Sequence, residues 1–274
     1  MVRFRLPSVC RVSGYLRAMP KVQSRPSAAQ RRIALLLPVS SALVLLGTSS
    51  PAFGQAYSGK PCSVKGNAAL ANLKVGQTID AMDQSLTGSF SHWATSTLAA
   101  TGKPPAPPAL PTGEEDELNE AGWRRDEWSC MYAADKAFDG KTETAWCEGV
   151  KGAGAGEAVM VKVDVSRPIS IWTGLGKSPA LFAANARPRK VAVWVLAADK
   201  ALAHQFGTGY ADIRVLARGE VELADKNEFQ DLTLPKFDLP EGSAATFLVI
   251  QVLSVYPGKK YADCCICEVV NPEG

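Results

Sequence analysis

Residues 246–255 read Thr246-Phe247-Leu248-Val249-Ile250-Gln251-Val252-Leu253-Ser254-Val255, a run that is almost wholly apolar. A strand that lies between two neighbours in a sheet and is covered on both faces has few positions left for polar side chains. The run therefore predicts a central, buried β-strand.

Shorter segments of alternating polarity surround this strand, which is the pattern of half-buried strands. They are Val159–Val165, Ile169–Trp172, Val191–Leu196, Ile213–Leu216, Val221–Leu223 and Leu232–Leu234. Turn signals separate them, at Asp139-Gly140, Gly152–Gly156, Ala186-Arg187-Pro188, Pro240-Glu241-Gly242 and Pro257-Gly258. Seven or eight short strands within about 145 residues predict an all-β sandwich or jelly roll.

Residues 57–128 differ in texture from this region. Leu70–Met82 is one short periodic run that is compatible with a helix. Lys103–Pro111 is rich in proline and predicts extended, polyproline-like chain. The acidic run Glu114–Glu117 follows it, so we predict a largely disordered, low-structure linker over 57–128. In this reading the pair His92-Trp93 is incidental.

Residues 1–56 have the three parts of a secretory signal peptide. Arg31-Arg32 precedes an apolar stretch over 33–46, and small residues follow over 47–52. A spanning helix needs about 20 apolar residues, and this stretch is shorter. We predict a cleaved signal peptide, with an uncleaved anchor and a twin-arginine signal as alternatives. Cleavage after Ala52, Gly54 or Ala56 fits equally.

The net charge of +3 over 274 residues is unevenly distributed. Residues 1–56 hold eight of the 30 Lys and Arg residues and none of the 27 Asp and Glu residues, so residues 57–274 carry about −5. An acidic mature chain has no basic stripe for phosphates, which argues against a nucleic-acid partner. We expect contact with a membrane only through the leader before cleavage, and a secreted or periplasmic location.

Six cysteines remain once Cys10 leaves with the leader: Cys62, Cys130, Cys147, Cys264, Cys265 and Cys267. An even number in an exported chain favours disulfides, and six cysteines allow 15 pairings. The cluster from Cys264 to Cys267 also resembles half of a zinc site. Cys130 and Cys147 lack partners at metal spacing, so disulfides are the preferred interpretation.

Three stretches carry a family resemblance. They are Ala137-Phe138-Asp139-Gly140-Lys141-Thr142-Glu143-Thr144-Ala145-Trp146-Cys147-Glu148-Gly149; Gly174-Leu175-Gly176-Lys177 with Asn185–Val191; and Ser254–Tyr261 with Asp263, Cys265 and Glu268. Together they resemble the discoidin-like (coagulation factor 5/8 C-type) domain of bacterial secreted proteins. The similarity is to the subgroup found as the translocation and glycan-binding domain of NAD glycohydrolase, and it covers roughly residues 129–271.

The resemblance implies a galactose-binding-like jelly-roll sandwich whose loops at one end bind sugars or lipid heads. It also implies a structural Ca²⁺ beside the Asp-Gly turn, with Asp139, Thr144 and Glu268 as side-chain ligands and carbonyls near Lys136 and Lys141 completing the shell. Such hard oxygen ligands suit calcium. The alternative is that Asp139 only caps its turn and that Glu268 pairs with a lysine.

For the cysteines, the resemblance implies that Cys265 is the residue shared with the family, with Cys147 as its partner. Cys130 is then expected to pair with Cys264 or Cys267, and Cys62 with the cysteine that remains. One departure from the family pattern is Leu175, at a position that is typically tyrosine.

Six residues supply the groups that hold sugars, namely aromatic faces, amides and cations that reach vicinal hydroxyls. They are Trp172, Asn185, Arg187, Tyr256, Lys260 and Tyr261. The alternative is structural, with Trp146 and Trp172 in the core and Arg187 paired with Glu157.

Catalytic signals are weak, because His92 and His204 are the two histidines and no serine or cysteine has an activating context. We predict a secreted, non-catalytic glycan-binding module without an organic cofactor, which mediates adhesion or surface attachment to a glycan or glycoconjugate. The alternative is a protein- or lipid-surface interaction domain that binds no sugar.

Overall fold

The computed structural model describes residues 62–80, 82–85, 90–106, 115–205 and 207–272. All of the described residues belong to one compact unit, residues 51–274. The predicted signal peptide lies outside the described residues, as do residues 107–114 of the proline-rich and acidic runs.

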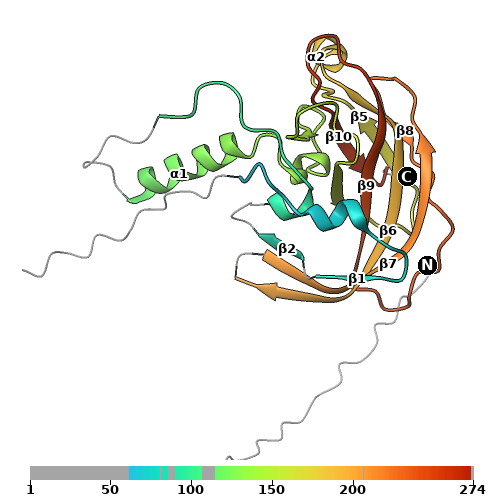
Figure 1. Ribbon diagram of the computed structural model, residues 1–274. Coiled ribbons are helices and arrows are strands. Elements are labelled where there is room, and N and C mark those ends of the chain that lie inside the picture. Colours follow the sequence, from blue (N-terminus) through green and yellow to red (C-terminus); the bar gives the residue numbers. More distant parts are fainter. Residues whose placement is uncertain (1–61, 81, 86–89, 107–114, 206, 273–274) are drawn as a thin grey trace, which may run out of the picture. The chain divides into compact units, whose positions relative to one another are not determined.

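Two antiparallel sheets pack into a sandwich (Figure 1). The first has the order β1-β7-β6-β9-β4, with β2 also paired to β7, and consists of β1 (Thr78–Ile79), β2 (Met82–Ser85), β4 (Ala158–Lys162), β6 (Arg187–His204), β7 (Gly207–Glu222) and β9 (Ala245–Tyr256). The second has the order β3-β10-β5-β8 and consists of β3 (Trp146–Cys147), β5 (Ser170–Thr173), β8 (Gln230–Asp231) and β10 (Cys265–Val270). The predicted all-β jelly-roll sandwich is confirmed.

In the described ranges, helices are few and short, apart from α1 (Glu115–Ser129). The others are α2 (Pro179–Ala184) and three 3₁₀ turns, η1 (Ala68–Asn72), η2 (Phe90–Trp93) and η3 (Ala134–Ala137). Ser178 caps the start of α2, where its side chain accepts a hydrogen bond from Leu181 N, and Pro179 occupies the first helical position. These choices place α2 at one end of the sandwich (Figure 1).

The predicted central strand is β9, which pairs with β6 on one side and β4 on the other. Val249, for example, lies opposite both Trp194 of β6 and Met160 of β4. Phe247, Leu248, Val249 and Ile250 are all fully buried. The continuous apolar pattern arises because this strand is covered on both faces.

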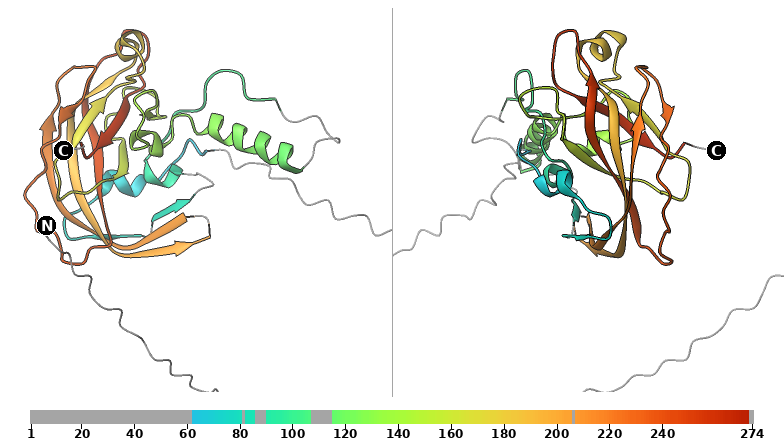
Figure 2. Two further views of the ribbon diagram at one scale, coloured as in Figure 1. Left: turned by 180° about the vertical axis from the view of Figure 1, so that it is seen from behind. Right: turned by 45° about the vertical axis from the view of Figure 1, so that its right-hand side comes forward.

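Residues 57–128 are predicted to be linker, and the structure differs over the described part of that range. Ala94 forms a bridge with Val159 of β4, and Thr95 N donates to Ala158 O at 2.9 Å. The segment thus continues the sheet beyond β4, and Figure 2 shows it beside the sandwich in both views. The periodic run Leu70–Met82 is not one helix, since it begins in η1 and then contributes β1 and the start of β2.

Trp93 packs the N-terminal segment, residues 62–106, against the sandwich. Its indole is fully buried and meets Phe90, Phe138 and Phe247, with ring centroids 5.4, 5.6 and 5.7 Å away. Its Nε1 donates to His92 Nε2 at 3.0 Å. The pair His92-Trp93, predicted to be incidental, therefore joins the N-terminal segment to β9 through the aromatic core.

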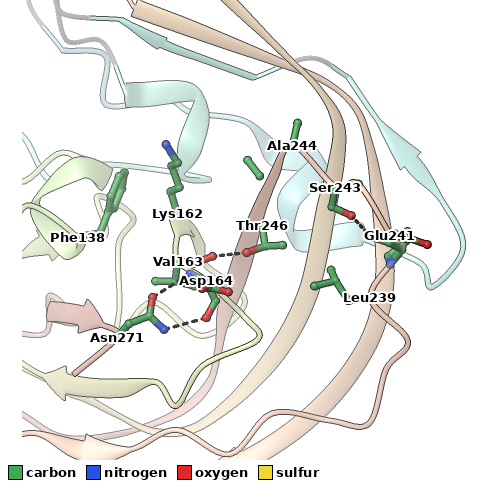
Figure 3. Close-up of a pocket in the computed structure, with 13 residues that line it drawn as sticks. Phe138, Lys162, Val163, Asp164, Leu239, Glu241, Ser243, Ala244, Thr246 and Asn271 are labelled. Atoms are coloured by element: carbon green, nitrogen blue, oxygen red, sulfur yellow. Dashed lines mark hydrogen bonds between the residues drawn. The ribbon is translucent and has the colours of Figure 1, made fainter. Parts of the chain in front are cut away.

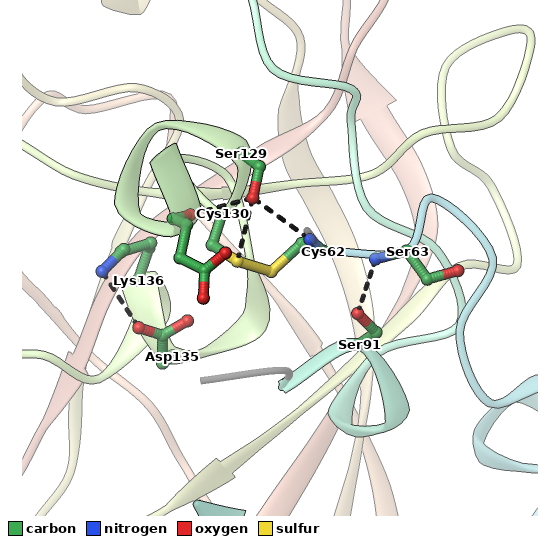
Figure 4. Close-up of a disulfide and its surroundings, with 8 residues drawn as sticks. Cys62, Ser63, Ser91, Ser129, Cys130, Asp135 and Lys136 are labelled. Atoms are coloured by element: carbon green, nitrogen blue, oxygen red, sulfur yellow. Dashed lines mark hydrogen bonds and ion pairs between the residues drawn. A yellow bond between two sulfur atoms is a disulfide. The ribbon is translucent and has the colours of Figure 1, made fainter. Parts of the chain in front are cut away.

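Two disulfides join cysteines in the part of the chain that the structure describes. Cys147–Cys265 joins β3 to β10 at directly paired positions, so this pairing is confirmed. The predicted pairing of Cys130 with Cys264 or Cys267 is wrong, because Cys130 pairs with Cys62 (Figure 4). The N-terminal segment returns to the end of α1, where Cys62 N donates to Ser129 Oγ at 3.2 Å and brings the two sulfurs together.

Cys264, just before β10, and Cys267, within β10, are buried thiols. Burial raises the pKa of both, to about 11 for Cys267, so they stay protonated at neutral pH. Two long-range disulfides are typical of proteins outside the reducing cytoplasm. Among the described residues, no helix combines the length and apolar character that crossing a membrane requires.

Candidate functional site

The Asp-Gly turn brings the three predicted calcium ligands together. Gly140 has a φ of +76°, which an L-residue rarely adopts and which lets the chain reverse directly after Asp139. Thr144 Oγ1 donates to the two carboxylate oxygens of Asp139 at 2.9 and 3.1 Å. From β10, Glu268 Oε2 accepts from the backbone N–H groups of Gly140 and Lys141 at 3.0 and 3.1 Å.

Glu268 of β10, which contacts this turn, has one carboxylate oxygen without a hydrogen-bond partner among the described residues. The residue is 1% exposed, and its Oε1 accepts no hydrogen bond from the described residues. Burial and then the charge of Asp139 raise the pKa of Glu268 to about 7. Lys136 contacts Asp135 and Asp139, at 3.0 and 3.8 Å. A buried carboxylate oxygen beside a second carboxylate fits the donor set of a hard cation.

The described residues contain no group of three or more His, Cys, Asp and Glu side chains placed to hold a metal ion. A cation at this turn would therefore depend on Thr144 and on backbone carbonyls as well as on the two carboxylates. The geometry fits calcium, which accepts neutral oxygen ligands, better than it fits zinc.

A second cluster lies at the α2 end of the sandwich, where β6 begins and β9 ends. Arg187 is 6% exposed and makes four hydrogen bonds. Its Nη1 donates to Asn185 O at 2.8 Å and to Pro257 O at 3.2 Å, while Nε and Nη2 donate to the carboxylate of Asp225 at 2.9 and 2.7 Å. One side chain thus holds three loops together, and its acid partner is Asp225 and not Glu157.

Gly174 makes room for this arginine. A Cβ at position 174 would lie 2.6 Å from Arg187 Cγ and 2.8 Å from the ring of Phe182, and the φ of Gly174 is +79°. The guanidinium in turn lies over the Phe182 ring, at 5.0 Å from its centroid. The glycine of the family-like stretch is therefore required by packing.

The other predicted ligand-binding residues fall into two groups. Asn185 is buried, with Nδ2 donating to Leu181 O at 2.9 Å, and the Tyr256 hydroxyl donates to Leu223 O at 3.0 Å. Lys260 and Tyr261 face solvent instead, with Lys260 Nζ 4.9 Å from the centre of the Tyr261 ring. The polar atoms of the first pair face the protein, so they shape the loops, while the second pair is accessible.

Trp172 contacts a loop in which no ligand-binding residue was predicted. Its Nε1 donates to Asn227 Oδ1 at 3.0 Å, and its ring lies edge to face with Phe229, with centroids 5.1 Å apart. Asp225, Asn227 and Phe229 all belong to the loop before β8. The available signal was their spacing at alternate positions, which places side chains of extended chain on one side.

A groove of about 940 Å³ lies at the opposite end of β9 (Figure 3). None of the predicted ligand-binding residues lines it; it is formed by Phe138, Lys162–Asp164, Leu239–Thr246 and Asn271. Thr246 Oγ1 donates to Val163 O at 2.5 Å, and Asn271 Nδ2 donates to Asp164 O at 2.8 Å. These hydrogen bonds join the walls of the groove to each other, so we assign these polar groups a structural role.

Comparison with protein families adds an independent line of evidence. The model of the NAD glycohydrolase translocation F5/8 type C domain matches residues 118–271, which include most of α1 and every strand named above except β1 and β2. No curated protein matches the chain. The chain therefore belongs to the family of NAD glycohydrolase translocation F5/8 type C domains.

Proposed function

We propose that this protein is an extracytoplasmic, non-catalytic carbohydrate-binding module that holds a glycan or glycoconjugate with the loops at the α2 end. The observation that carries the proposal is the construction of that end. Arg187 fixes three loops from below, while aromatic side chains on the surrounding loops stay accessible, with Phe229 40% and Tyr261 41% exposed.

This arrangement suits sugars for a physical reason. Saccharides present apolar C–H faces edged by hydroxyls, so they are held by an exposed aromatic ring beside fixed donors and acceptors. Loops that are already pinned lose little conformational entropy on binding. Export is supported by the Cys62–Cys130 and Cys147–Cys265 disulfides. We also propose that the protein is not an enzyme, because its two histidines lie in separate elements, His92 in η2 and His204 at the C-terminal end of β6.

A glycan array probed with residues 51–274, the compact unit of the chain, tests the proposal. We expect saturable binding to a limited set of glycans. Failure to bind any glycan at high protein concentration, with and without calcium, would reject the carbohydrate reading. Binding to lipid vesicles or to a protein under those conditions would support the alternative of a lipid- or protein-surface domain.

We also propose that the Asp-Gly turn binds a structural calcium ion. Asp139, Thr144 and the Oε1 atom of Glu268 would be side-chain ligands, and the ion would supply positive charge between two carboxylates. The support is the buried, unpartnered Oε1 of Glu268 together with the raised pKa of that carboxyl. Calcium binding would then lock the Asp-Gly turn to β10.

The pH dependence of stability checks this site. Without calcium, folded Glu268 binds its proton up to about pH 7, whereas its ordinary pKa is 4.5. The folded state holds more protons between these values, so this contribution to the free energy of unfolding is lost as the pH rises from 4.5 to 7. Buried Glu148, with its pKa also raised to about 7, adds in the same direction. We expect stability in EDTA to fall over this window in urea titrations.

Calcium should reverse the effect of Glu268, because it favours the ionised carboxylate. At a hundredfold excess over Kd, stabilisation of about 2.7 kcal/mol is expected at pH 8, and much less at pH 5. Glu268→Gln should abolish this response, while Glu148→Gln, the matched control, should keep it. An equal calcium response in wild type and Glu268→Gln would contradict the site.

A further inference from the structure

We propose that the loop 225–229 is the recognition surface of the glycan site, and that it selects an uncharged saccharide. Asp225 supplies a fixed acceptor, Asn227 a fixed donor and Phe229 an aromatic face. Arg187 and Trp172 are positioning residues beneath them. This inference rests on the proposed function and assigns the contact residues and the ligand class within it.

The loop is closed at its base by one side chain. The Gln230 amide accepts from Ala224 N at 2.8 Å and donates to Ala224 O at 3.1 Å, so it joins the two ends of the loop as a backbone pair would. Lys226 and Glu228 pair with each other at 3.5 Å and are exposed. The odd-numbered residues contact Arg187 and Trp172 instead, and Asp225 and Phe229 remain partly exposed beside these contacts, so they are both held by the sandwich and accessible to a ligand.

Asn227 has a fixed orientation. An indole N–H only donates, so the atom that Trp172 Nε1 contacts must be Oδ1. The Nδ2 amide group is thereby turned away from Trp172, and no described residue accepts a hydrogen bond from it. The two N–H groups of the Asn227 amide are therefore left for a ligand. Their position is set by Trp172, which is half-buried in β5.

Asp225 is fixed in the same way by Arg187, through one hydrogen bond to each carboxylate oxygen. Its side chain nevertheless remains 38% exposed, and each oxygen keeps a lone pair for a hydroxyl donor. Beside these polar groups, Phe229 is 40% exposed and its ring is held by Trp172. Acceptor, donor and apolar face are the three elements that a pyranose ring requires.

The charges of the loop indicate which sugars fit. The positive charge of Arg187 is neutralised by Asp225, and that of Lys226 by Glu228. Within the loop 225–229 no unpaired cation remains, and the Asp225 carboxylate is the member of its ion pair that a ligand can reach, because its side chain is 38% exposed and that of Arg187 is 8% exposed. A sugar carboxylate or sulfate placed there would meet like charge. Neutral glycans should therefore bind better than sialylated, uronic or sulfated ones.

Binding of residues 51–274 to an array of neutral and acidic glycans, repeated with single variants, tests the inference. Asn227→Asp keeps the acceptor for Trp172 and removes the donors, so it should weaken binding ~10-fold with an unchanged melting temperature. Phe229→Ala should weaken binding by a similar factor. Leu239→Ala is the matched control, since Leu239 is 38% exposed and lies in the groove at the other end of β9.

The outcomes separate this inference from the proposed function. Retained binding in both loop variants overturns the inference and leaves the proposed function standing. A loss of binding in Leu239→Ala alone would place the glycan in the groove, and would overturn both the inference and the site at the α2 end. Hits confined to acidic glycans overturn the selectivity. If wild type binds no glycan, both the inference and the proposed function fail.

Discussion

A fragment limited to residues 118–271 is expected to be unfolded, although this range is the part of the chain that matches the family. Its removal of residues 62–106 deletes Leu70, Leu73, Phe90 and Trp93 from the core and leaves Cys130 without Cys62. It also exposes the edge of β4 that Ala94 and Thr95 cover.

The loss is comparable with the whole stability of a domain. A buried tryptophan is worth about 3–5 kcal/mol and each of the other three side chains about 1.5–3 kcal/mol, so the total is about 10 kcal/mol against a typical 5–15 kcal/mol. Circular dichroism should show a cooperative thermal transition for residues 51–274 and none for the fragment.

Point variants in residues 51–274 separate the packing of this segment from its length. Trp93→Ala should lower the free energy of unfolding by about 3–5 kcal/mol. Val75→Ala, at a position that is 58% exposed in the same segment, should change it by less than about 0.5 kcal/mol. A fragment 118–271 that melts cooperatively near the temperature of the longer chain would show that the N-terminal segment is dispensable.

Replacing Arg187 with alanine is expected to destabilise the protein, and not only to weaken ligand binding. The substitution removes four hydrogen bonds and separates the loops around Asn185, Asp225 and Pro257. Breaking a fully buried ion pair costs about 3–5 kcal/mol. Because Asp225 is partly exposed, we expect about 3 kcal/mol, a fall in melting temperature of roughly 6–12 °C for a domain of this size.

Arg189 is the matched control for this prediction. It lies two residues further along β6, is largely exposed and pairs with Glu222 on the surface at 3.1 Å. Arg189→Ala should cost less than about 1 kcal/mol. Arg187→Lys keeps the charge but loses the two-pronged contact with Asp225, so it should also destabilise. An unchanged melting temperature for Arg187→Ala would return the residue to the role of a direct sugar ligand.

The sandwich itself follows from the pattern of the sequence. Residues 246–255 are continuously apolar because β9 lies between β4 and β6, and the alternating segments become β4, β5, β6 and β7. The Asp-Gly turn could be located because aspartate, threonine and a positive-φ glycine occur at fixed, local spacing. Local periodicity carries these features.

The N-terminal segment could not be predicted because its structure lacks a period. Short 3₁₀ turns, the single bridge at Ala94 and the position of Trp93 in the core depend on contacts with β4 and β9, which are distant in sequence. The Cys62–Cys130 disulfide follows from the same fold-back. Where a pattern is absent, tertiary contacts decide the conformation.

The candidate ligand-binding residues were predicted from their side-chain chemistry, and the structure divides them into buried and exposed side chains. Arg187, Asn185 and Tyr256 have the chemistry of sugar ligands but direct it to Asp225, Leu181 and Leu223. Of these partners, Asp225 lies on the loop before β8 and keeps hydrogen-bonding capacity toward solvent, because its side chain is partly exposed. The sequence does not show that Arg187 is the buried member of this pair and Asp225 the accessible one; the three-dimensional contacts do.

Chemical-shift mapping with the neutral glycan that binds best tests the central claim most directly. In ¹⁵N-labelled residues 51–274, the amides of residues 224–230, the Asn227 side-chain amide and the Trp172 indole N–H should shift on titration, and those of Leu239–Thr246 should not. Shifts confined to the groove around Leu239–Thr246, or no shifts at saturating glycan, would contradict a carbohydrate site at the α2 end.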